Sequence, residues 1–357
     1  MGLNLASLLT ESAERAPDSP AIRLGELELS YGELDERSAR LATLLSEKGI
    51  EPGDRVGVML PNVPDFPVAY YGVLQAGGIV VPMNVLLKRR EIAFYLEDSG
   101  AKLLLAWHGF AEEARDGAAD AGAEMIEVEP ASFASRLAEH EPTAGLVDTA
   151  EDDTAVILYT SGTTGRPKGA ELTHRNIHLN AQRSASVIQE MTPDDVVMGC
   201  LPLFHVFGLV VGLNAATVVG ASLALIPRFD PAAAIEVIEK ERVTIMQGVP
   251  TMYAAILNHP QSDGMDASSL RVCASGGSAM PLEVMRSFED KFGCIILEGY
   301  GLSETSPVAS FNMPTMERKP GTIGVAIPGC EMKCVDLDGN EVPVGEVGEI
   351  AIRGDNV

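Results

Sequence analysis

The chain has 357 residues, of which 46% are hydrophobic and 22% charged, and its formal net charge is -25. This length and apolar content can bury a large core shared among more than one structural unit. The acidic balance excludes functions that need a broad basic surface, so we expect neither nucleic acid nor an anionic membrane as a partner. A small anionic ligand is still allowed, because charges beyond about 8 Å are largely screened at physiological salt.

Cysteine usage and the N-terminal residues indicate where the protein works. The five cysteines are scattered and contain no C-x-x-C pair, so we expect neither a disulfide framework nor a zinc site. Residues 1–5 lack a basic region followed by an apolar core, so no secretory signal is predicted. We therefore expect a cytoplasmic protein.

The first part of the chain alternates apolar strands with helical segments. Predicted strands lie at 55–60, 79–81, 102–106 and 125–128, and predicted helices at 65–76 and 91–98. Continuous apolar strands separated by helices are typical of a parallel sheet covered on both faces. The polar, acidic stretch 139–153 is predicted to be a surface connector.

A loop rich in glycine and hydroxyl groups occupies residues 160–169, with the sequence TSGTTGRPKG. It follows an apolar run at 155–159, predicted to be a buried strand, and precedes a predicted helix at 174–189. Glycines let backbone N–H groups face an anion, Ser and Thr hydroxyls add donors, and Lys168 adds a point charge. It is not a Walker A loop, because Lys168 lies between Pro and Gly. We predict a polyphosphate-binding loop; an ordinary solvated connection is the alternative.

The apolar stretch 206–226 is about as long as the roughly 20 residues that cross a bilayer. Glycine and polar residues interrupt it, and Gly220 is typical of a helix end. We therefore predict a buried helix followed by a strand at 221–226, and no transmembrane segment.

A second set of strands and helices follows at about 195–314. It includes a strand at 271–274, a turn at 275–278 and a helix at 281–292. After Gly321 the pattern predicts antiparallel strands at 331–337 and 346–353 around a turn at 338–340. The predicted fold is α/β, with two packed subdomains at 1–190 and 191–320 and a small β-barrel-like subdomain beginning at 321–357.

Residues 298–305, EGYGLSET, follow a predicted strand at 294–297. Ligands of α/β sheets bind at the carboxyl ends of strands. Tyr300 can lie flat against a base, and Glu304 is an oxygen ligand suited to Mg²⁺ held jointly with phosphates. In the alternative, Tyr300 is a core aromatic and Glu304 is a helix N-terminal charge.

Three weaker clusters also follow strands. The turn 275–278 lets the backbone approach a flat ligand, although ordinary turns share its composition. His205 lies among aromatic residues, where most histidines are buried and satisfied. Residues 247–253 include the adaptable Met252, for which core packing is the usual role.

Together these residues resemble the adenylate-forming superfamily of acyl-CoA synthetases, luciferases and peptide-synthetase adenylation domains. The resemblance covers essentially the whole chain and is most specific at 159–169 and 299–305, with 276–278 between them. It implies ATP, Mg²⁺ and coenzyme A as cofactors and small-molecule substrates, with a homodimer left open. The nearest group is the fatty-acid–CoA ligases, which convert an acid to acyl-AMP and then to a thioester.

The resemblance also implies roles for individual residues. Lys168, Glu304, Thr305 and His205 would serve catalysis, with Glu304 as the Mg²⁺ ligand and Thr305 on the α-phosphate. The implied nucleotide contacts are Thr160, Ser161, Gly162, Thr163, Thr164, Gly165, Lys168, Gly276, Gly277, Ser278, Glu298, Gly299, Tyr300, Gly301 and Thr305. The implied acyl contacts are His205, Val206, Phe207, Val249, Met252, Tyr253, Ala274, Ser275 and Gly301.

The acid is expected to be a medium or long fatty acid. Residues 204–207 carry no Asp for a substrate amine, and the single Trp107 lies outside the motifs. An aryl acid stays open, as does a nucleotide-binding module without catalysis. A kinase is disfavoured because the loop at 160–169 does not match the Walker A pattern. The family pattern continues past Val357, so we expect the large N-terminal portion of such an enzyme, weak or inactive by itself.

Overall fold

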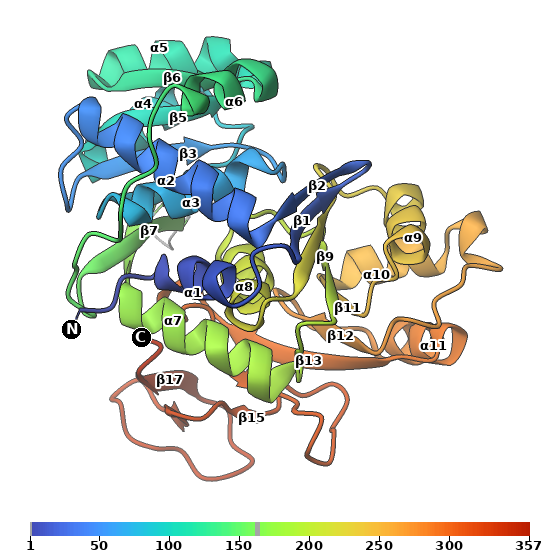
Figure 1. Cartoon of the computed structure of the whole chain (residues 1–357). Coiled ribbons are helices and arrows are strands. Elements are labelled where there is room, and N and C mark those ends of the chain that lie inside the picture. The colour runs from blue at the N-terminus through green and yellow to red at the C-terminus, as the bar shows by residue number, and fades with distance from the viewer. Residues whose placement is uncertain (1, 161–164) are drawn as a thin grey trace.

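The chain folds around two helix-covered sheets, with the first at the upper left of Figure 1 and the second running through its centre and right. The computed structural model describes residues 2–160 and 165–357. The first sheet has the strand order β6-β5-β3-β4-β7-β8, and the second has the order β15-β14-β13-β12-β11-β9-β10-β1-β2. The central strands of both are parallel, and antiparallel pairs lie at both edges of the second sheet and at the β8 edge of the first. The predicted α/β fold with largely parallel, covered sheets is confirmed.

The strands of the first sheet are β3 (Arg55–Met59), β4 (Ile79–Pro82), β5 (Ala101–Trp107), β6 (Glu124–Val128), β7 (Thr154–Thr160) and β8 (Lys168–Thr173). Those of the second are β1 (Pro20–Leu24), β2 (Leu27–Ser30), β9 (Val196–Gly199), β10 (Ser222–Leu225), β11 (Ile245–Gly248), β12 (Val272–Ser275), β13 (Ile295–Gly301), β14 (Val308–Phe311) and β15 (Val325–Ala326). A separate antiparallel pair is formed by β16 (Cys330–Val335) and β17 (Glu349–Gly354).

The helices cover both sheets. They are α1 (Ser7–Arg15), α2 (Tyr31–Glu47), α3 (Asp65–Gln75), α4 (Arg89–Ser99), α5 (Ala111–Ala121), α6 (Pro130–Ala138), α7 (His174–Arg183), α8 (Ala215–Val219), α9 (Pro231–Lys240), α10 (Pro250–Leu257) and α11 (Leu282–Phe292). Local sequence sets several of their ends. At the start of α2, for example, Ser30 Oγ accepts from Glu33 N at 3.2 Å while Glu33 accepts from Ser30 N at 2.9 Å.

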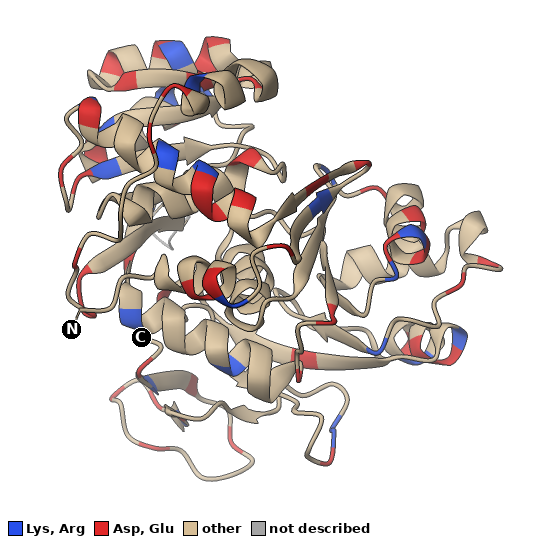
Figure 2. Cartoon of the chain, in the orientation of Figure 1, with Lys and Arg blue, Asp and Glu red and all other residues tan. Residues whose placement is uncertain are grey.

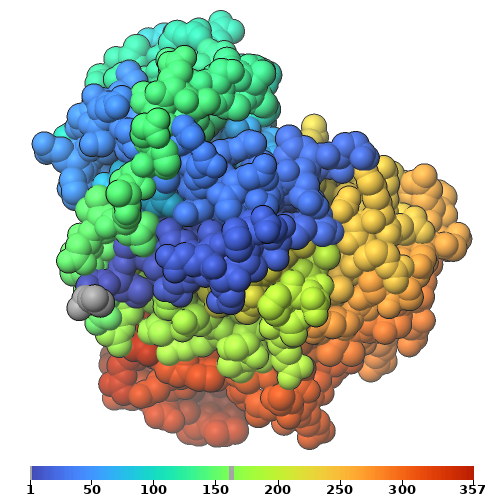
Figure 3. Space-filling model, viewed as in Figure 1, coloured from blue at the N-terminus to red at the C-terminus, as the bar shows by residue number. Residues whose placement is uncertain are grey.

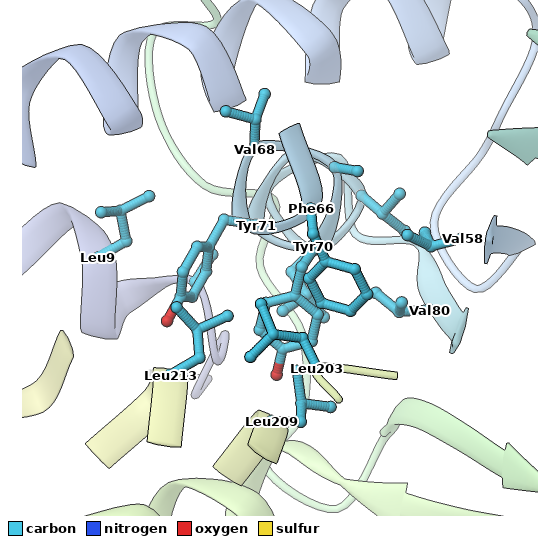
Figure 4. Close-up of a cluster of buried hydrophobic side chains, with 14 of the residues drawn as sticks. Leu9, Val58, Phe66, Val68, Tyr70, Tyr71, Val80, Leu203, Leu209 and Leu213 are labelled. Atoms are coloured by element: carbon cyan, nitrogen blue, oxygen red, sulfur yellow. The ribbon is translucent and has the colours of Figure 1, made fainter. Parts of the chain in front are cut away.

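The largest core joins the two sheets through α3, which is buried on almost every side. Figure 4 shows its Phe66, Tyr70 and Tyr71 between strand residues of the first sheet and the apolar segment around Leu209 and Leu213. The hydroxyls of Tyr70 and Tyr71 both bond the buried amide of Asn214. Tyr71 Oη donates to Asn214 Oδ1 at 2.9 Å, and Tyr70 Oη accepts from Asn214 Nδ2 at 2.9 Å. Such satisfied buried polar groups fix the relative position of the packed elements.

The apolar stretch 206–226 is a buried helix followed by a strand, as predicted. It comprises a π-helical segment at Phe207–Asn214, then α8 and β10, with Gly220 in the left-handed conformation (φ +85°) between them. Across the two ranges that the structure describes, no helix has the length and apolarity needed to span a membrane.

Strand β8 was not predicted. The sequence favours a direct passage from the glycine-rich loop to helix 174–189, but residues 168–173 first pair antiparallel with β7 along the edge of the first sheet. Pairing at the sheet edge gives the backbone of this segment its hydrogen-bond partners. Because most of its side chains are polar, the sequence lacks the alternation of apolar residues that would have predicted a strand. The helix itself is α7 followed by a π-helical turn at Ser184–Ile188.

The N-terminal strands belong to the second sheet, although the first sheet follows them in the chain. Residues 20–30 form β1 and β2, and β1 lies parallel to β10 at the edge of the second sheet. Figure 3 shows this dark-blue segment across the middle of the surface, against both upper and right-hand parts.

The predicted division of the chain into subdomains at residues 190 and 320 stays a prediction.

The predicted hairpin near the C-terminus differs in its connection. Strands β16 and β17 pair as expected, but they are joined by residues 336–348, not by a tight turn at 338–340. The turn exists within this loop, where Asp336 Oδ1 accepts from the backbone N of Asp338 and Asn340 at 2.9 and 2.8 Å. The Asp side chain thus closes a local turn without setting the strand register.

Candidate active site

A cavity of about 260 Å³ lies at the carboxyl ends of β12 and β13. Its walls come from three places: the start of the π-helical segment, the turn after β12, and the β13–β14 connection. They are formed by His205, Val206, Phe207, Gly276, Gly277, Gly299, Tyr300, Gly301, Leu302, Ser303, Pro307, Val308 and Phe311. Carboxyl ends of parallel strands are the usual ligand sites of α/β sheets, so this is the candidate active site.

Close approaches at two glycines shape this cavity. A Cβ on Gly276 would lie 3.2 Å from the Phe207 ring, so the ring packs directly over the backbone after β12. A Cβ on Gly301 would lie 1.8 Å from the carbonyl oxygen of Pro307, which no side chain allows. These positions explain why the cavity needs glycine on both walls.

His205 lies at the cavity with an exposed side chain. Its Nδ1 accepts from the backbone N of Phe207 at 3.2 Å, so the ring is oriented by the segment that it begins. Desolvation by the surrounding protein lowers the pKa of His205. The imidazole is therefore neutral at pH 7, and it offers a polar group without charge to a ligand.

The predicted polyphosphate loop connects β7 and β8. Thr160 pairs with Lys168 at the loop end of this hairpin, and Lys168 is exposed. Gly165 has φ +82°, a conformation that favours glycine. Ser161, Gly162, Thr163 and Thr164 lie outside the described residues. The phosphate contacts of this loop stay predictions.

The turn Ser303–Thr305 packs against β8. It carries Glu304, whose side chain is exposed, next to Leu302 and Ser303 of the cavity wall. The side-chain amide of Asn180, on α7, holds the turn in place. It donates hydrogen bonds to the carbonyl oxygens of Thr305 at 3.4 Å and Val308 at 2.9 Å. The element that starts with Lys168 and the one that carries Glu304 are therefore neighbours.

Thr305 itself is buried, with 2% of its surface exposed. Its Oγ1 accepts from Leu302 N at 2.9 Å and bonds the carbonyl oxygen of Pro307. This hydroxyl holds the turn together in the structure, and its predicted contact with an α-phosphate requires it to exchange one of these partners.

Glu298 has a supporting place beside the cavity. Its carboxylate accepts from Met280 N at 3.1 Å and from Gly321 N at 2.9 Å, so both oxygens already have backbone partners. It thereby ties the turn after β12 to the chain that follows residue 320. Ser278, on that same turn, is exposed and does not line the cavity.

The predicted acyl contacts fall into two groups. His205, Val206, Phe207 and Gly301 line the cavity, and Val249 lies behind it, with its Cγ1 3.3 Å from a Cβ on Gly277. The others belong to the packed interior: Met252, Tyr253, Ala274 and Ser275.

Tyr253 lies away from the residues that line the cavity. It is fully buried, donates its hydroxyl to Ala274 O at 2.8 Å, and packs edge-on against Phe288 at 5.1 Å between ring centroids. Its hydroxyl bonds Met246 O of β11 and Ala274 O of β12, so the side chain faces the sheet core. Val249 precedes α10, and the sequence pattern alone did not show which face of the helix that follows meets the core.

The cavity also has walls that the sequence reasoning missed. Pro307, Val308 and Phe311 belong to the β13–β14 connection and to β14, which was not predicted. Leu302 and Ser303 lie within the 298–305 segment, but no contact was predicted for these two residues. The short apolar run after Pro307 was the available signal, but four residues cannot be assigned to a strand by periodicity.

The charged side chains and the oxygen ligands near the cavity limit which ion the site can hold. Figure 2 shows Lys and Arg dispersed among more frequent Asp and Glu along the elements. Within residues 2–160 and 165–357, no group of three or more His, Cys, Asp or Glu side chains is placed to hold a metal. An exposed Glu304 carboxylate fits Mg²⁺, which commonly takes one or two carboxylates together with substrate phosphates.

Comparisons with known proteins agree with this geometry. The chain is 34% identical to a long-chain-fatty-acid–CoA ligase of Bacillus subtilis, covering 99% of this chain and 69% of that protein. It is 36% identical to a feruloyl-CoA synthase of an Amycolatopsis species, covering 99% and 70%. The ATP-bound crystal structure of MatB from Rhodopseudomonas palustris superposes with a TM-score of 0.92 at 31% identity, covering 100% of this chain and 71% of that one.

The model of the AMP-binding enzyme family matches residues 9–357. That range includes both sheets, the β7–β8 hairpin and every residue that lines the cavity. CoA ligases of this family use ATP, Mg²⁺ and coenzyme A. By sequence and by fold, the chain belongs to the AMP-binding enzyme family.

Proposed function

We propose that this chain is an AMP-forming acid–thiol ligase that activates a fatty acid with ATP and transfers the acyl group to coenzyme A. The observation that carries the proposal is the packing of β8, which begins at Lys168, against the turn that holds Glu304, beside the cavity. A cation and a carboxylate on adjoining elements are what a triphosphate and its metal require.

The reaction has two displacements. In the first, a carboxylate oxygen of the acid bonds to the α-phosphorus of ATP while the bond to the bridging oxygen breaks, and pyrophosphate leaves. In the second, the sulfur of coenzyme A bonds to the acyl carbon, the bond to AMP breaks, and the thiol proton passes to solvent. No protein side chain forms a covalent bond, so the site contributes orientation and electrostatic stabilisation.

Particular residues have separate tasks in this scheme. Lys168 neutralises charge on the departing pyrophosphate, while Glu304 holds Mg²⁺ and Thr305 positions the α-phosphate. When bound, Mg²⁺ reduces the repulsion between the attacking carboxylate and the phosphates. Tyr300 lies between glycines, so it offers its ring to the adenine.

The cavity lining supports an acid with an apolar body. Val206, Phe207, Val308 and Phe311 contribute apolar surface, and none of the described residues that line the cavity is acidic. An amino-acid substrate would leave its ammonium group without a carboxylate partner. The Bacillus relative named for long-chain fatty acids supports the same choice.

A second candidate substrate is an aryl acid. The rings of Phe207 and Phe311 line the cavity, where they can stack with or edge-pack on an aromatic acid. The feruloyl-CoA synthase relative supports this alternative. The two candidates share the adenylation step and differ only in the acid.

The test is acid-dependent exchange of labelled pyrophosphate into ATP with palmitate, octanoate, ferulate and benzoate. The proposal predicts exchange with a fatty acid and release of AMP. Exchange with ferulate or benzoate alone would transfer the assignment to the aryl acids. ATP binding without exchange for any acid would indicate a nucleotide-binding module, and release of ADP would indicate phosphoryl transfer; either result would contradict the proposal.

A further inference from the structure

Helix α4 faces the β7–β8 hairpin with an aromatic and acidic surface that the proposed function has not used. It consists of Phe94, Tyr95 and Asp98, which are exposed or half-buried on a helix otherwise anchored by Ile92 and Leu96 in the core. The helix packs against α5 and β5 and ends at Gly100 in the left-handed conformation, so it is a firm support.

The arm of the hairpin that enters the loop contacts this surface through Tyr159. The Tyr159 and Tyr95 rings stack with centroids 4.1 Å apart and 16° between their planes. The Tyr159 hydroxyl donates to Asp98 Oδ2 at 2.8 Å. Burial, followed by the hydrogen bond to Asp98, raises the pKa of Tyr159, so the phenol stays protonated and keeps donating.

The arm that leaves the loop contacts the same surface through Arg166. Its guanidinium carbon lies 4.6 Å from the centroid of the Phe94 ring, within the range of a cation–π interaction. The Phe94 ring is also 6.1 Å from the Tyr159 ring, at 71°. The contacts of the two arms are therefore continuous with each other on one face of α4.

Lys168 lies between these anchored points. It is two residues after Arg166, and the next residue, Gly169, pairs with Tyr159. A Cβ on Gly169 would lie 3.5 Å from Tyr159 Cζ, so the ring extends across the strand that begins with Lys168. Both contacts therefore lie next to the backbone that carries the lysine.

We infer that Phe94, Tyr95 and Asp98 form a positioning surface on α4 that fixes both arms of the β7–β8 hairpin and so sets the affinity for MgATP. The surface acts through the hairpin, which makes these three residues positioning residues. The inference rests on the proposed function only in assigning the hairpin to ATP. It does not depend on which acid is activated.

The test measures the dissociation constant of MgATP by calorimetry on the 357-residue chain. This binding measurement needs no carboxylic acid substrate. An exposed cation–π pair corresponds to about a two- to five-fold change in an equilibrium constant, so Phe94→Leu is expected to weaken binding by about that factor. Arg166→Gln is expected to weaken it at least as much. The double variant should bind no more weakly than Arg166→Gln, because the two residues act as a pair.

Two further variants separate positioning from general damage. Phe94→Tyr keeps the ring face and should restore wild-type affinity. Phe110→Leu removes a half-buried aromatic from the hydrophobic cluster that also includes Tyr95 and Tyr159. Among the described residues, Phe110 has no aromatic pair or cation–π contact with the hairpin, so this variant should leave affinity unchanged. Thermal unfolding of each variant reports whether the fold is retained.

The outcomes are distinct. Wild-type affinity in Phe94→Leu, additive losses in the double variant, or an equal loss in Phe110→Leu would overturn the inference. The predicted affinities together with no acyl-AMP for any acid would overturn the proposed function and leave the positioning surface intact. A wild-type chain that does not bind MgATP would overturn both.

Discussion

Acidification is expected to unfold this protein partly through one buried histidine. His174, the first residue of α7, has 1% of its surface exposed. Its Nδ1 accepts from Leu5 N at 2.9 Å, and Asn4 on the same segment donates to Leu74 O at 2.8 Å and Val147 O at 2.9 Å. A proton on Nδ1 would remove the acceptor that holds the N-terminal segment on α7.

Burial lowers the pKa of His174 from its ordinary 6.5 to about 4. Because the folded-state pKa lies below the unfolded one, the stabilising contribution is complete above pH 6.5 and is lost as pH falls from 6.5 towards 4. The difference corresponds to about 3 kcal/mol in full, of which about 2 kcal/mol is lost by pH 5.

The assay compares the free energy of unfolding by urea in the wild-type chain and in His174→Gln at pH 5, 6, 7 and 8. Glutamine can accept a hydrogen bond but does not titrate. Asp65 works in the opposite direction, since burial raises its pKa to about 6. Both proteins carry Asp65, so its contribution cancels in the comparison.

The difference between the two proteins should be constant from pH 7 to 8 and should change by about 2 kcal/mol in favour of the variant by pH 5. Parallel pH profiles down to pH 5 would refute the assignment of His174 as a buried neutral acceptor. A divergence that begins above pH 7 would refute the proposed pKa.

Three further predictions concern the site. Glu304→Gln should raise the Mg²⁺ concentration for half-maximal acyl-AMP formation by about ten-fold, the scale of one charged contact, and an unchanged metal titration would remove Glu304 from its role. Lys168→Ala should slow acyl-AMP formation by about a hundred-fold in single-turnover measurements, and a wild-type rate would contradict its place on the pyrophosphate. Gly301→Ala, whose Cβ would meet Pro307 O at 1.8 Å, should lower the free energy of unfolding by about 3 kcal/mol or more, whereas Gly145→Ala, which meets nothing within 4 Å, should not.

Much of the fold follows from local patterns. The strands β3 to β7 and helices α3, α4 and α11 were predicted with nearly their observed bounds. Each is either a continuous apolar run or an amphipathic segment closed by glycine, so its state depends on neighbours in sequence. The glycine-rich segment before Lys168 and the EGYGLSET segment were likewise recognisable from residue types alone.

Residue order and residue type were therefore enough to predict the α/β class, the order of the main elements and the two segments that we propose bind the nucleotide. Three features became apparent only in the folded chain: β8 pairs along the edge of the first sheet, Phe311 lines the cavity, and Tyr253 lies in the core. Each of these depends on which side of an element faces a partner distant in sequence. Spacing fixes which residues share a face, but packing between separate elements fixes what that face meets.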